Sequence, residues 1–308
     1  MKQKVLITTS SFGRFGDTVL EKLESNNLEI ITNPYKRKLT ESELSGLLQK
    51  EKPIGLIAGT EPVTAKVLNK SAEFLHVVSR VGVGWDNIDH KAAKSIGIKV
   101  YRTPDAVTQT TAELTLGLIL NLLRKINQMD HELKAGLWEK RMGTLLQDKK
   151  VGIIGFGRIG RCLAQLLVPF KVKIRYYDII KIEDNHLGKK MSLHNLLTES
   201  DIVSLHVSAS GSNAAILNEK ELMLMKKGSW LVNASRGGVV DEAALYDALS
   251  SGHLSGAAID VFESEPYKGP LTSLPNVILT PHIGSYASEA RERMETEAVD
   301  NLIEGLER

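Results

Sequence analysis

The sequence has a single cysteine and almost no net charge. Cys162 is the only cysteine among 308 residues, which excludes an internal disulfide and a cysteine-rich metal site, and we expect it to be a core residue of a helix packed on a sheet. The 39 lysines and arginines nearly balance the 37 aspartates and glutamates, for a formal charge of +2. No strong field therefore indicates nucleic acid or an anionic membrane as a partner. We expect a small-molecule partner and no bound metal.

Long apolar runs are lacking as well. The most apolar helical stretch, 114–123, contains Asn121 and is flanked by Glu113 and Arg124. It is too short to span a bilayer and predicts a buried helix. The first residues, MKQKVLITTS, lack the apolar core and small-residue cleavage site of a secretory signal. These features predict a cytoplasmic protein.

Short β-branched runs alternate with helix-like segments along the chain. A first series of expected strands lies at 5–7, 29–31, 55–58 and 76–78, with helices near 16–25 and 41–51; a second series lies at 151–154, 173–177, 202–205, 230–233, 257–261 and 277–279. This alternation predicts two parallel α/β sheets, and the length fits two domains. A helical region near 108–134 separates the two series. The last segment, 286–307, predicts one charged amphipathic helix.

A glycine-rich turn opens the second series. The strand 151–154 runs into GFGRIG (155–160), after which 161–167 is helix-like. Gly155 permits the tight turn, Gly157 lets the backbone approach a pyrophosphate, and Gly160 lets helix and strand pack closely. Because the N-terminus of the helix then faces the anion, the sequence predicts a dinucleotide-binding turn.

Asp178 follows the next strand at about the separation expected for an acid that binds the ribose. Its carboxylate can accept hydrogen bonds from both ribose hydroxyls but would repel a 2′-phosphate, and Ile179 and Ile180 offer no compensating cation. NAD is therefore favoured over NADP. The alternative is a structural turn beside a solvated aspartate.

Arg236, Glu265 and His282 each follow an apolar strand of the second series. Open α/β sheets bind ligands at the carboxyl ends of their strands. Oxidation of a hydroxy acid needs a base for the hydroxyl proton, a cation for the carboxylate and a group that holds the base in position. Taken singly, a histidine after proline, a solvated arginine and a loop glutamate all have structural explanations. Their combination is what indicates hydride transfer.

Five motifs together resemble the D-isomer-specific 2-hydroxyacid dehydrogenase family over nearly the whole chain. They are VSRVGVGWDNID (78–89), GFGRIG (155–160), NASRGGVVDE (233–242), AIDVFESEP (258–266) and TPHIGS (280–285). The resemblance implies an α/β fold with two doubly wound parallel-sheet domains. A Rossmann NAD-binding domain (103–285) would be inserted into a discontinuous, flavodoxin-like substrate domain (1–102 and 286–308). It also implies an NAD-dependent oxidoreductase that transfers a hydride between nicotinamide and a small D-2-hydroxy or 2-oxo acid, and a homodimer formed through the cofactor domain.

The resemblance also implies roles for individual residues. Arg236 would bind the substrate carboxylate and polarise the carbonyl, His282 would be the general acid/base, and Glu265 would hydrogen-bond His282 and raise its pKa. Beside Gly155, Gly157, Gly160 and Asp178, the implied cofactor contacts are Thr111, Arg158, Ile159, Val207, Ala234, Ser235, Arg236, Asp260, His282 and Gly284. The implied substrate contacts are Arg80, Val81, Gly82, Val83, Gly84, Arg236 and His282.

The identity of the acid stays open at this point. The segment 136–161 is most similar to phosphoglycerate dehydrogenase-like members, so phosphoglycerate, hydroxypyruvate and glyoxylate are the candidate types. However, Gly59 and Thr60 stand where phosphoglycerate-using relatives commonly place an arginine that meets the phosphate. Arg80, or Lys140 and Arg141 reaching across a dimer interface, are other possible cations, although each also fits a solvated surface.

Two other functions are compatible with the same residues. One is an NADH-sensing, corepressor-like binding protein of the same fold, in which Arg236, Glu265 and His282 persist without catalysis. The other is a dehydrogenase of an inorganic or one-carbon anion, which the same arginine and histidine would serve. Turnover on a panel of acids separates these functions.

Overall fold

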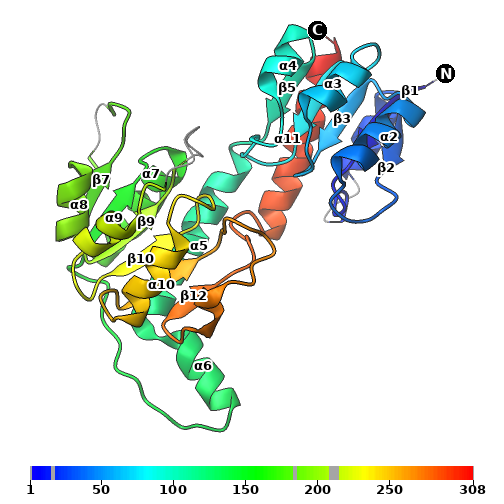
Figure 1. The fold of residues 1–308 in the computed structure, drawn as a ribbon. Helices are drawn as coiled ribbons and strands as arrows, with labels where there is room; N and C mark the ends of the chain where they lie inside the picture. Colours follow the sequence, from blue (N-terminus) through cyan, green and yellow to red (C-terminus); the bar gives the residue numbers. More distant parts are fainter. Residues whose placement is uncertain (1, 15–17, 183–185, 208–214, 308) are drawn as a thin grey trace. The chain divides into compact units, whose positions relative to one another are not determined.

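The computed structural model describes residues 2–14, 18–182, 186–207 and 215–307. The chain forms two compact units, one of Met1–Val107 with Ser285–Arg308 and one of Thr108–Gly284 (Figure 1). Each unit is built around one sheet, and the described strands pair in parallel. The predicted architecture of two parallel α/β sheets is therefore confirmed. None of the described helices is long and apolar enough to cross a membrane.

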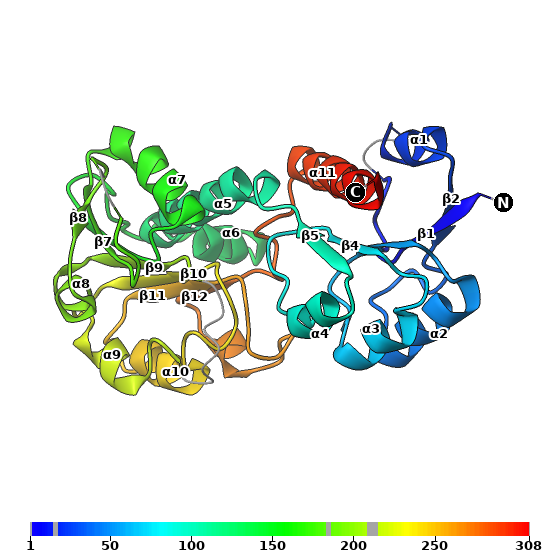
Figure 2. The same cartoon turned by 90° about the horizontal axis from the view of Figure 1, so that it is seen from above.

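The first unit contains a five-stranded sheet with the order β2-β1-β3-β4-β5, which is the flavodoxin-like order. Its strands are β1 (Gln3–Ile7), β2 (Leu28–Thr32), β3 (Gly55–Ala58), β4 (Val77–Arg80) and β5 (Lys99–Arg102). Helices α1 (Thr18–Ser25) and α11 (Ser288–Glu307) cover one face, and α2 (Glu41–Glu51), α3 (Ala65–Ser71) and α4 (His90–Ser95) cover the other (Figure 2). Strand β5 and helices α3 and α4 are not predicted from the sequence, because segments of four to seven residues are too short to show a clear period.

The C-terminal helix α11 belongs to the core of the first unit. Its buried residues Met294, Ala298, Val299 and Leu302 cluster with apolar side chains of the first sheet. Lys99 Nζ donates a hydrogen bond to the carbonyl of Gly305 at 2.8 Å, which fixes the end of the helix beside β5. The helix expected over 286–307 thus packs on a sheet whose other elements lie at the opposite end of the sequence.

The second unit contains a seven-stranded sheet with the order β12-β11-β10-β9-β6-β7-β8. Its strands are β6 (Lys150–Ile154), β7 (Lys173–Tyr177), β8 (Lys189–Lys190), β9 (Ile202–Leu205), β10 (Trp230–Asn233), β11 (Gly256–Ile259) and β12 (Val277–Leu279). Helices α5 (Ala106–Arg124) and α7 (Arg158–Leu167) lie on one face, and α8 (Leu193–Glu199), α9 (Glu219–Leu224) and α10 (Glu242–Ser250) lie on the other (Figure 2). Two short 3-10 helices, Val168–Phe170 and Pro270–Ser273, complete the unit.

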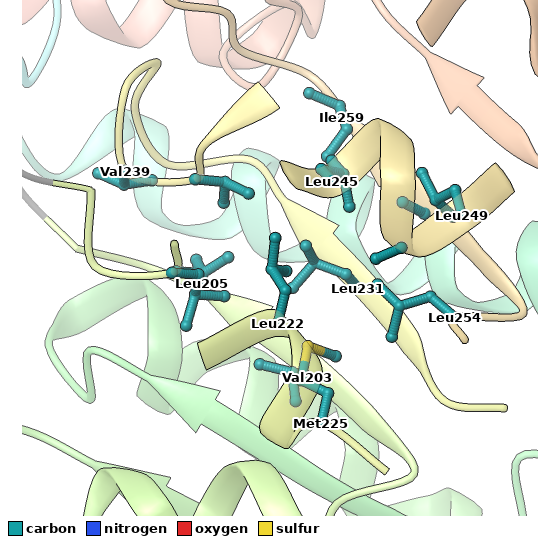
Figure 3. Close-up of a cluster of buried hydrophobic side chains, with 14 of the residues drawn as sticks. Val203, Leu205, Leu222, Met225, Leu231, Val239, Leu245, Leu249, Leu254 and Ile259 are labelled. Carbon is teal, nitrogen blue, oxygen red and sulfur yellow. The ribbon is translucent and has the colours of Figure 1, made fainter. Parts of the chain in front are cut away.

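The central strands β6, β9, β10 and β11 are buried on both faces, as expected for a parallel sheet covered by helices. Figure 3 shows the cluster on the side of α9 and α10, where side chains of the sheet and of the helices point toward one another. The labelled members are Val203, Leu205, Leu222, Met225, Leu231, Val239, Leu245, Leu249, Leu254 and Ile259. This packing fixes the strand ends from which the candidate site is built.

The expectation that Cys162 is a core residue holds only in part, since Cys162 is half-buried and packs against the edge of an apolar cluster. Helix α7 buries Gly160, Leu163, Ala164 and Leu167, which recur at helical spacing on the face toward the sheet. Cys162 lies outside this stripe and is partly exposed, with its Sγ 3.1 Å from Gln109 Oε1. Partial burial still raises the pKa of its thiol.

The helical region expected over 108–134 consists of two helices. Helix α5 ends at Arg124, Lys125 adopts a left-handed conformation with φ 53°, and α6 (Ile126–Lys134) follows. The side chain of Asn121 accepts a hydrogen bond from the backbone N–H of Asn127 at 2.8 Å, which stabilises the change of direction. No residue of α6 is buried, and Figure 1 shows α6 and the loop after it projecting from the unit.

Truncation of Leu302 tests the place of α11 in the first unit. Leu302 is fully buried, so Leu302→Ala is expected to lower the free energy of unfolding by about 2–5 kcal/mol, measured by denaturant titration. Glu292→Ala removes an exposed side chain from the same helix, and it should change that value by less than about 0.5 kcal/mol. Equal stability of the two variants would contradict this packing.

Candidate functional site

The predicted site residues of the second unit gather at one edge of its sheet. Because the strands are parallel, the loops that follow them leave from the same edge, and the strand order reverses between β6 and β9. The glycine turn follows β6, Asp178 follows β7 and Val207 lies after β9; Ala234, Ser235 and Arg236 follow β10, Asp260 and Glu265 follow β11, and His282 and Gly284 follow β12. This edge is where an open α/β sheet binds ligands.

Gly155 and Gly160 have a steric reason to be glycine, whereas Gly157 leaves the backbone open. Gly155 has φ 88°, and a Cβ there would lie 2.3 Å from the carbonyl oxygen of His206. A Cβ at Gly160 would lie 2.3 Å from the carbonyl oxygen of Gly155, so the helix could not pack this closely with a larger residue. At Gly157, which caps α7, a Cβ would have no described atom within 4 Å. The first turn of α7, with Arg158 and Ile159, therefore begins at an open backbone that suits an anion.

Asp178 is fixed against this turn. Its Oδ2 accepts a hydrogen bond from the backbone N–H of Phe156 at 2.7 Å, and its Oδ1 accepts one from that of Ile180 at 2.8 Å. Ile179 and Ile180 beside it are exposed, at 88% and 67%. The carboxylate and two exposed isoleucines thus lie close to the open backbone at Gly157.

His282 and Glu265 form a hydrogen-bonded pair. His282 Nδ1 lies 3.0 Å from Glu265 Oε2 and 3.1 Å from Oε1, and both side chains remain partly exposed. Glu265 Oε1 also accepts a hydrogen bond from the backbone N–H of Phe262 at 3.1 Å, which holds the carboxylate in place. When Nδ1 donates to the carboxylate, Nε2 is left to exchange a proton with a ligand.

The third member of the predicted set, Arg236, lies on the loop after β10. Its Nη1 donates a hydrogen bond to the carbonyl of Ser235 at 2.7 Å, and its own carbonyl accepts one from Asn233 Nδ2 at 3.1 Å. A Cβ at Gly237 would lie 1.8 Å from the carbonyl oxygen of Phe262. This close approach packs the arginine loop directly against the loop that carries Glu265.

Asp260 organises the turn that carries His282. Its carboxylate is fully buried and accepts hydrogen bonds from Thr280 Oγ1 at 2.5 Å, from the N–H of Ile283 at 2.8 Å and from the N–H of Gly284 at 2.9 Å. Thr111 of α5 donates to the carbonyl of Gly284 at 3.0 Å from the other side. The sequence alone does not predict this contact of Thr280, because its proximity to Asp260 comes from the β11–β12 register.

A half-buried histidine, whose Nδ1 atom is fully buried, follows β9 at the same edge. His206 Nε2 is 2.9 Å from Ser204 Oγ, and burial lowers the pKa of this histidine to about 4. Its Nδ1 has no hydrogen-bond partner among the described residues. The ring is therefore neutral near pH 7 and adds no charge below the glycine turn. The sequence around His206 does not indicate that its side chain is neutral and hydrogen-bonded to Ser204.

The predicted substrate residues 80–84 lie in the first unit, at the carboxyl end of β4. The N–H of Val81 donates to the carbonyl of Ala58 at 2.9 Å, and that of Gly82 donates to Thr103 Oγ1 at 2.7 Å. Gly82 adopts φ 131°, a conformation that favours glycine. Residues 83–84 follow, and the guanidinium of Arg102 lies 4.2 Å above the ring of Trp85. The loop is thus anchored on both sides.

The other cations considered for phosphate binding, Lys140 and Arg141, lie on the surface. Arg141, considered as a phosphate-binding cation, forms an ion pair with Glu132 at 2.7 Å, and Lys140 is exposed. Across the ranges that the structure describes, no group of three or more His, Cys, Asp or Glu side chains is arranged to hold a metal ion.

The sequence matches known proteins over nearly its whole length. Residues 116–284 match the family described as D-isomer specific 2-hydroxyacid dehydrogenase, NAD binding domain. A hydroxypyruvate reductase of Thermotoga maritima is 37% identical over 95% of this chain and 99% of its own length, and a D-3-phosphoglycerate dehydrogenase of Escherichia coli is 39% identical over 87% of this chain and 67% of its own. The crystal structure of the TT0316 protein from Thermus thermophilus superimposes with a TM-score of 0.90 at 35% identity, covering 99% of this chain and 97% of that one.

Replacement of Asp178 tests the cofactor end of the site. If Asp178 binds the ribose hydroxyls, as the sequence predicts, Asp178→Ala is expected to weaken NADH binding at least about ten-fold and to reduce discrimination against NADPH. Fluorescence titration with both nucleotides measures the effect. Asp130→Ala removes an aspartate from the projecting helix α6, and it should leave both affinities unchanged. A wild-type chain that prefers NADPH would contradict the assignment.

Proposed function

Because the chain belongs to the D-isomer specific 2-hydroxyacid dehydrogenase family, we propose that it interconverts a small D-2-hydroxy acid and its 2-oxo acid, of the glyoxylate, hydroxypyruvate or phosphoglycerate type. It is an NAD-dependent oxidoreductase of 2-hydroxy acids. The observation that carries the proposal is the His282–Glu265 pair, 3.0 Å apart, at the sheet edge that also holds the glycine turn. This arrangement combines a proton-transfer group with a dinucleotide site.

The residues of the second unit fit NAD. Gly155 and Gly160 allow a close approach of backbone, the backbone at Gly157 is open, and α7 directs its N-terminus there. In this proposal Gly155–Gly160 hold the pyrophosphate and Asp178 accepts hydrogen bonds from the ribose hydroxyls. NAD held by these residues would supply the hydride acceptor or donor. Further proposed contacts are Thr111, Val207, Ala234, Ser235, Asp260 and Gly284, with Asp260 acting through the backbone turn that its carboxylate holds.

In the direction of reduction, His282 delivers the proton. Its Nε2 donates to the carbonyl oxygen as the hydride reaches carbon, and the hydroxyl group forms; in the direction of oxidation the same nitrogen takes the hydroxyl proton. Glu265 holds the imidazole by accepting the Nδ1–H, which fixes the tautomer. Arg236 binds the substrate carboxylate and polarises the carbonyl through its guanidinium.

The same proposal assigns substrate binding to the first unit. Residues 1–102 and 286–308 would form the substrate domain and residues 103–285 the NAD-binding domain. Arg80 and the loop of Val81, Gly82, Val83 and Gly84 would contact the substrate, supported by the anchoring of that loop through Ala58 and Thr103. A cytoplasmic location stays a prediction from the sequence.

Loss of the proposed acid/base should abolish turnover but leave the cofactor bound. His282→Ala is expected to lower kcat by at least about 100-fold while NADH affinity stays nearly unchanged. His194 lies exposed on α8, so His194→Ala is the matched control and should retain wild-type turnover. Near-normal kcat in His282→Ala would end the proposed role.

Turnover across an acid panel tests the function as a whole. NADH and NADPH oxidation would be followed with glyoxylate, hydroxypyruvate, pyruvate and 3-phosphohydroxypyruvate, and NAD reduction with formate and phosphite. The expected result is NADH-dependent reduction of at least one 2-oxo acid. Tight NADH binding without any turnover would favour a sensor, and turnover of formate or phosphite alone would favour the one-carbon or inorganic chemistry.

We further propose that the chain forms a homodimer through its NAD-binding unit. Large apolar side chains are exposed on α6 and the loop that projects with it, among them Leu133, Leu137, Trp138, Met142 and Leu145. Trp138 and Met142 are 80% and 89% exposed. Several large apolar side chains exposed along one segment are typical of an interaction site. In this proposal the exposed side chains of α6 and its loop pack against a second copy of the chain.

Sedimentation measures the oligomeric state directly. The wild-type chain is expected to sediment as a dimer at micromolar concentration, and the double variant Trp138→Glu, Met142→Glu should shift toward monomer because charge disfavours an apolar contact. Tyr35→Ser removes an exposed aromatic residue from the first unit, and it should stay dimeric. A monomeric wild type would exclude the dimer.

A further inference from the structure

The loop after β4 is held by the end of the neighbouring strand β5. The two strands pair in parallel, with Arg80 opposite Arg102, so the segments that follow them leave the sheet side by side. Thr103 bonds to both backbone groups of Gly82. Its Oγ1 accepts a hydrogen bond from the N–H of Gly82 at 2.7 Å, and its own N–H donates to the carbonyl of Gly82 at 3.1 Å. The loop of residues 82–85 therefore begins at a fixed point.

Arg102 contacts the 82–85 loop at two places further along. Its Nη1 donates a hydrogen bond to the carbonyl of Val83 at 3.4 Å, and its guanidinium carbon lies 4.2 Å from the centroid of the Trp85 ring. A guanidinium over an indole face is attracted by the ring, and more strongly when the pair is partly desolvated. Arg102 and Trp85 are both half-buried. Among the residues that the structure describes, no carboxylate forms an ion pair with Arg102.

Both partners of this ring contact are fixed by other elements of the first unit. The rings of Trp85 and His90 of α4 meet edge to face, with centroids 4.2 Å apart and planes at 60°. His90 Nε2 also lies 3.2 Å from the carbonyl oxygen of Trp85. On the other partner, Asn301 of α11 donates from Nδ2 to the carbonyl of Arg102 at 3.1 Å. The contact between Arg102 and Trp85 thus links the loop to α4 and α11.

The loop depends on such contacts because two of its four residues are glycines. Glycine loses more conformational freedom on becoming ordered than any other residue. Gly82 adopts φ 131°, and Gly84 lies between the two residues that Arg102 contacts. Contacts from outside the loop must offset this loss of entropy. Thr103 supplies them at the start of the loop, and Arg102 supplies them over the rest.

We propose that Arg102 is a positioning residue for substrate binding, which keeps the 82–85 loop in the conformation that binds the 2-oxo acid through its contacts with Val83 and Trp85. The inference rests on the proposed function, in which residues 80–84 contact the substrate. Arg102 acts through the loop and not on the reacting atoms. Its loss should therefore weaken substrate binding and leave the chemical step, which belongs to residues of the second unit, unchanged.

The division of the effect between KM and kcat tests this role. The assay uses NADH and whichever of glyoxylate, hydroxypyruvate, pyruvate and 3-phosphohydroxypyruvate is turned over best. Arg102→Met keeps an unbranched side chain and removes the guanidinium; it is expected to raise KM at least about five-fold and to change kcat less than about two-fold. Arg102→Lys keeps the positive charge but not the planar group, and it should raise KM less. Fluorescence titration should show wild-type NADH affinity for both variants.

A double-mutant cycle tests whether Arg102 and Trp85 act as a pair. Trp85→Leu removes the ring and is also expected to raise KM at least about five-fold. The double variant Arg102→Met, Trp85→Leu should have a KM within about two-fold of the higher single variant, because both changes remove the same contact. Increases in KM that multiply would overturn the pair. If Arg102→Met fails to fold, Trp85→Leu alone decides, since a wild-type KM in that variant overturns the proposal.

A similar cation–ring contact in the same unit provides the control. The guanidinium of Arg37 lies 5.2 Å from the centroid of the Tyr35 ring, in the segment after β2, the strand at the opposite edge of the sheet from β5. Arg37→Met should leave KM and kcat unchanged. An equal rise in KM in Arg37→Met would reveal a general effect on the unit and overturn the role of Arg102.

The remaining outcomes separate this inference from the function on which it rests. A wild-type KM in Arg102→Met, with kcat either kept or lowered, overturns the positioning role while the oxidoreductase function stands. Absence of turnover by the wild-type chain on the whole acid panel overturns the proposed function, and this inference with it.

Discussion

The buried carboxylate of Asp260 is the constraint on which the geometry of the site depends. Removing a carboxylate from water is costly unless hydrogen bonds satisfy it. Thr280 Oγ1 and the N–H groups of Ile283 and Gly284 supply those bonds. His282 lies within the turn they enclose and adopts φ 55°, a left-handed conformation that costs a non-glycine residue about 1–3 kcal/mol. The hydrogen bonds to Asp260 offset that cost. Asp260 therefore positions His282 through the backbone of the neighbouring residues, without a direct contact to its side chain.

Much of the second unit could be predicted from local pattern. Apolar strands followed at once by Gly155, Asp178, Arg236 or His282 predict that these residues meet, because carboxyl ends of parallel strands lie at one edge. The hydrogen bond between Glu265 and His282 agrees with the pairing implied by the resemblance. These features are local, and each is readable from a strand and the few residues after it.

Other features depend on contacts between distant segments. Asp260 meets Thr280 only through the register of β11 with β12, and Glu61 is buried only because the ends of β1 and β3 meet around it. In the sequence, Gly59-Thr60-Glu61-Pro62 has the composition of an exposed turn. Cys162 follows an apolar pattern closely enough to suggest the core, yet it lies one step outside the stripe that faces the sheet. Burial of this kind is decided by packing and not by local propensity.

The return of α11 to the first unit also has a consequence for biosynthesis. Its residues Ala298 and Leu302 fill a core that includes Val5, Ile57 and Val77, so almost the entire chain must be translated before that core is complete. The second unit, whose residues are contiguous, has its full set of strands earlier. During elongation, the nascent first unit therefore presents an uncovered apolar sheet face, the kind of surface that chaperones bind and that promotes aggregation.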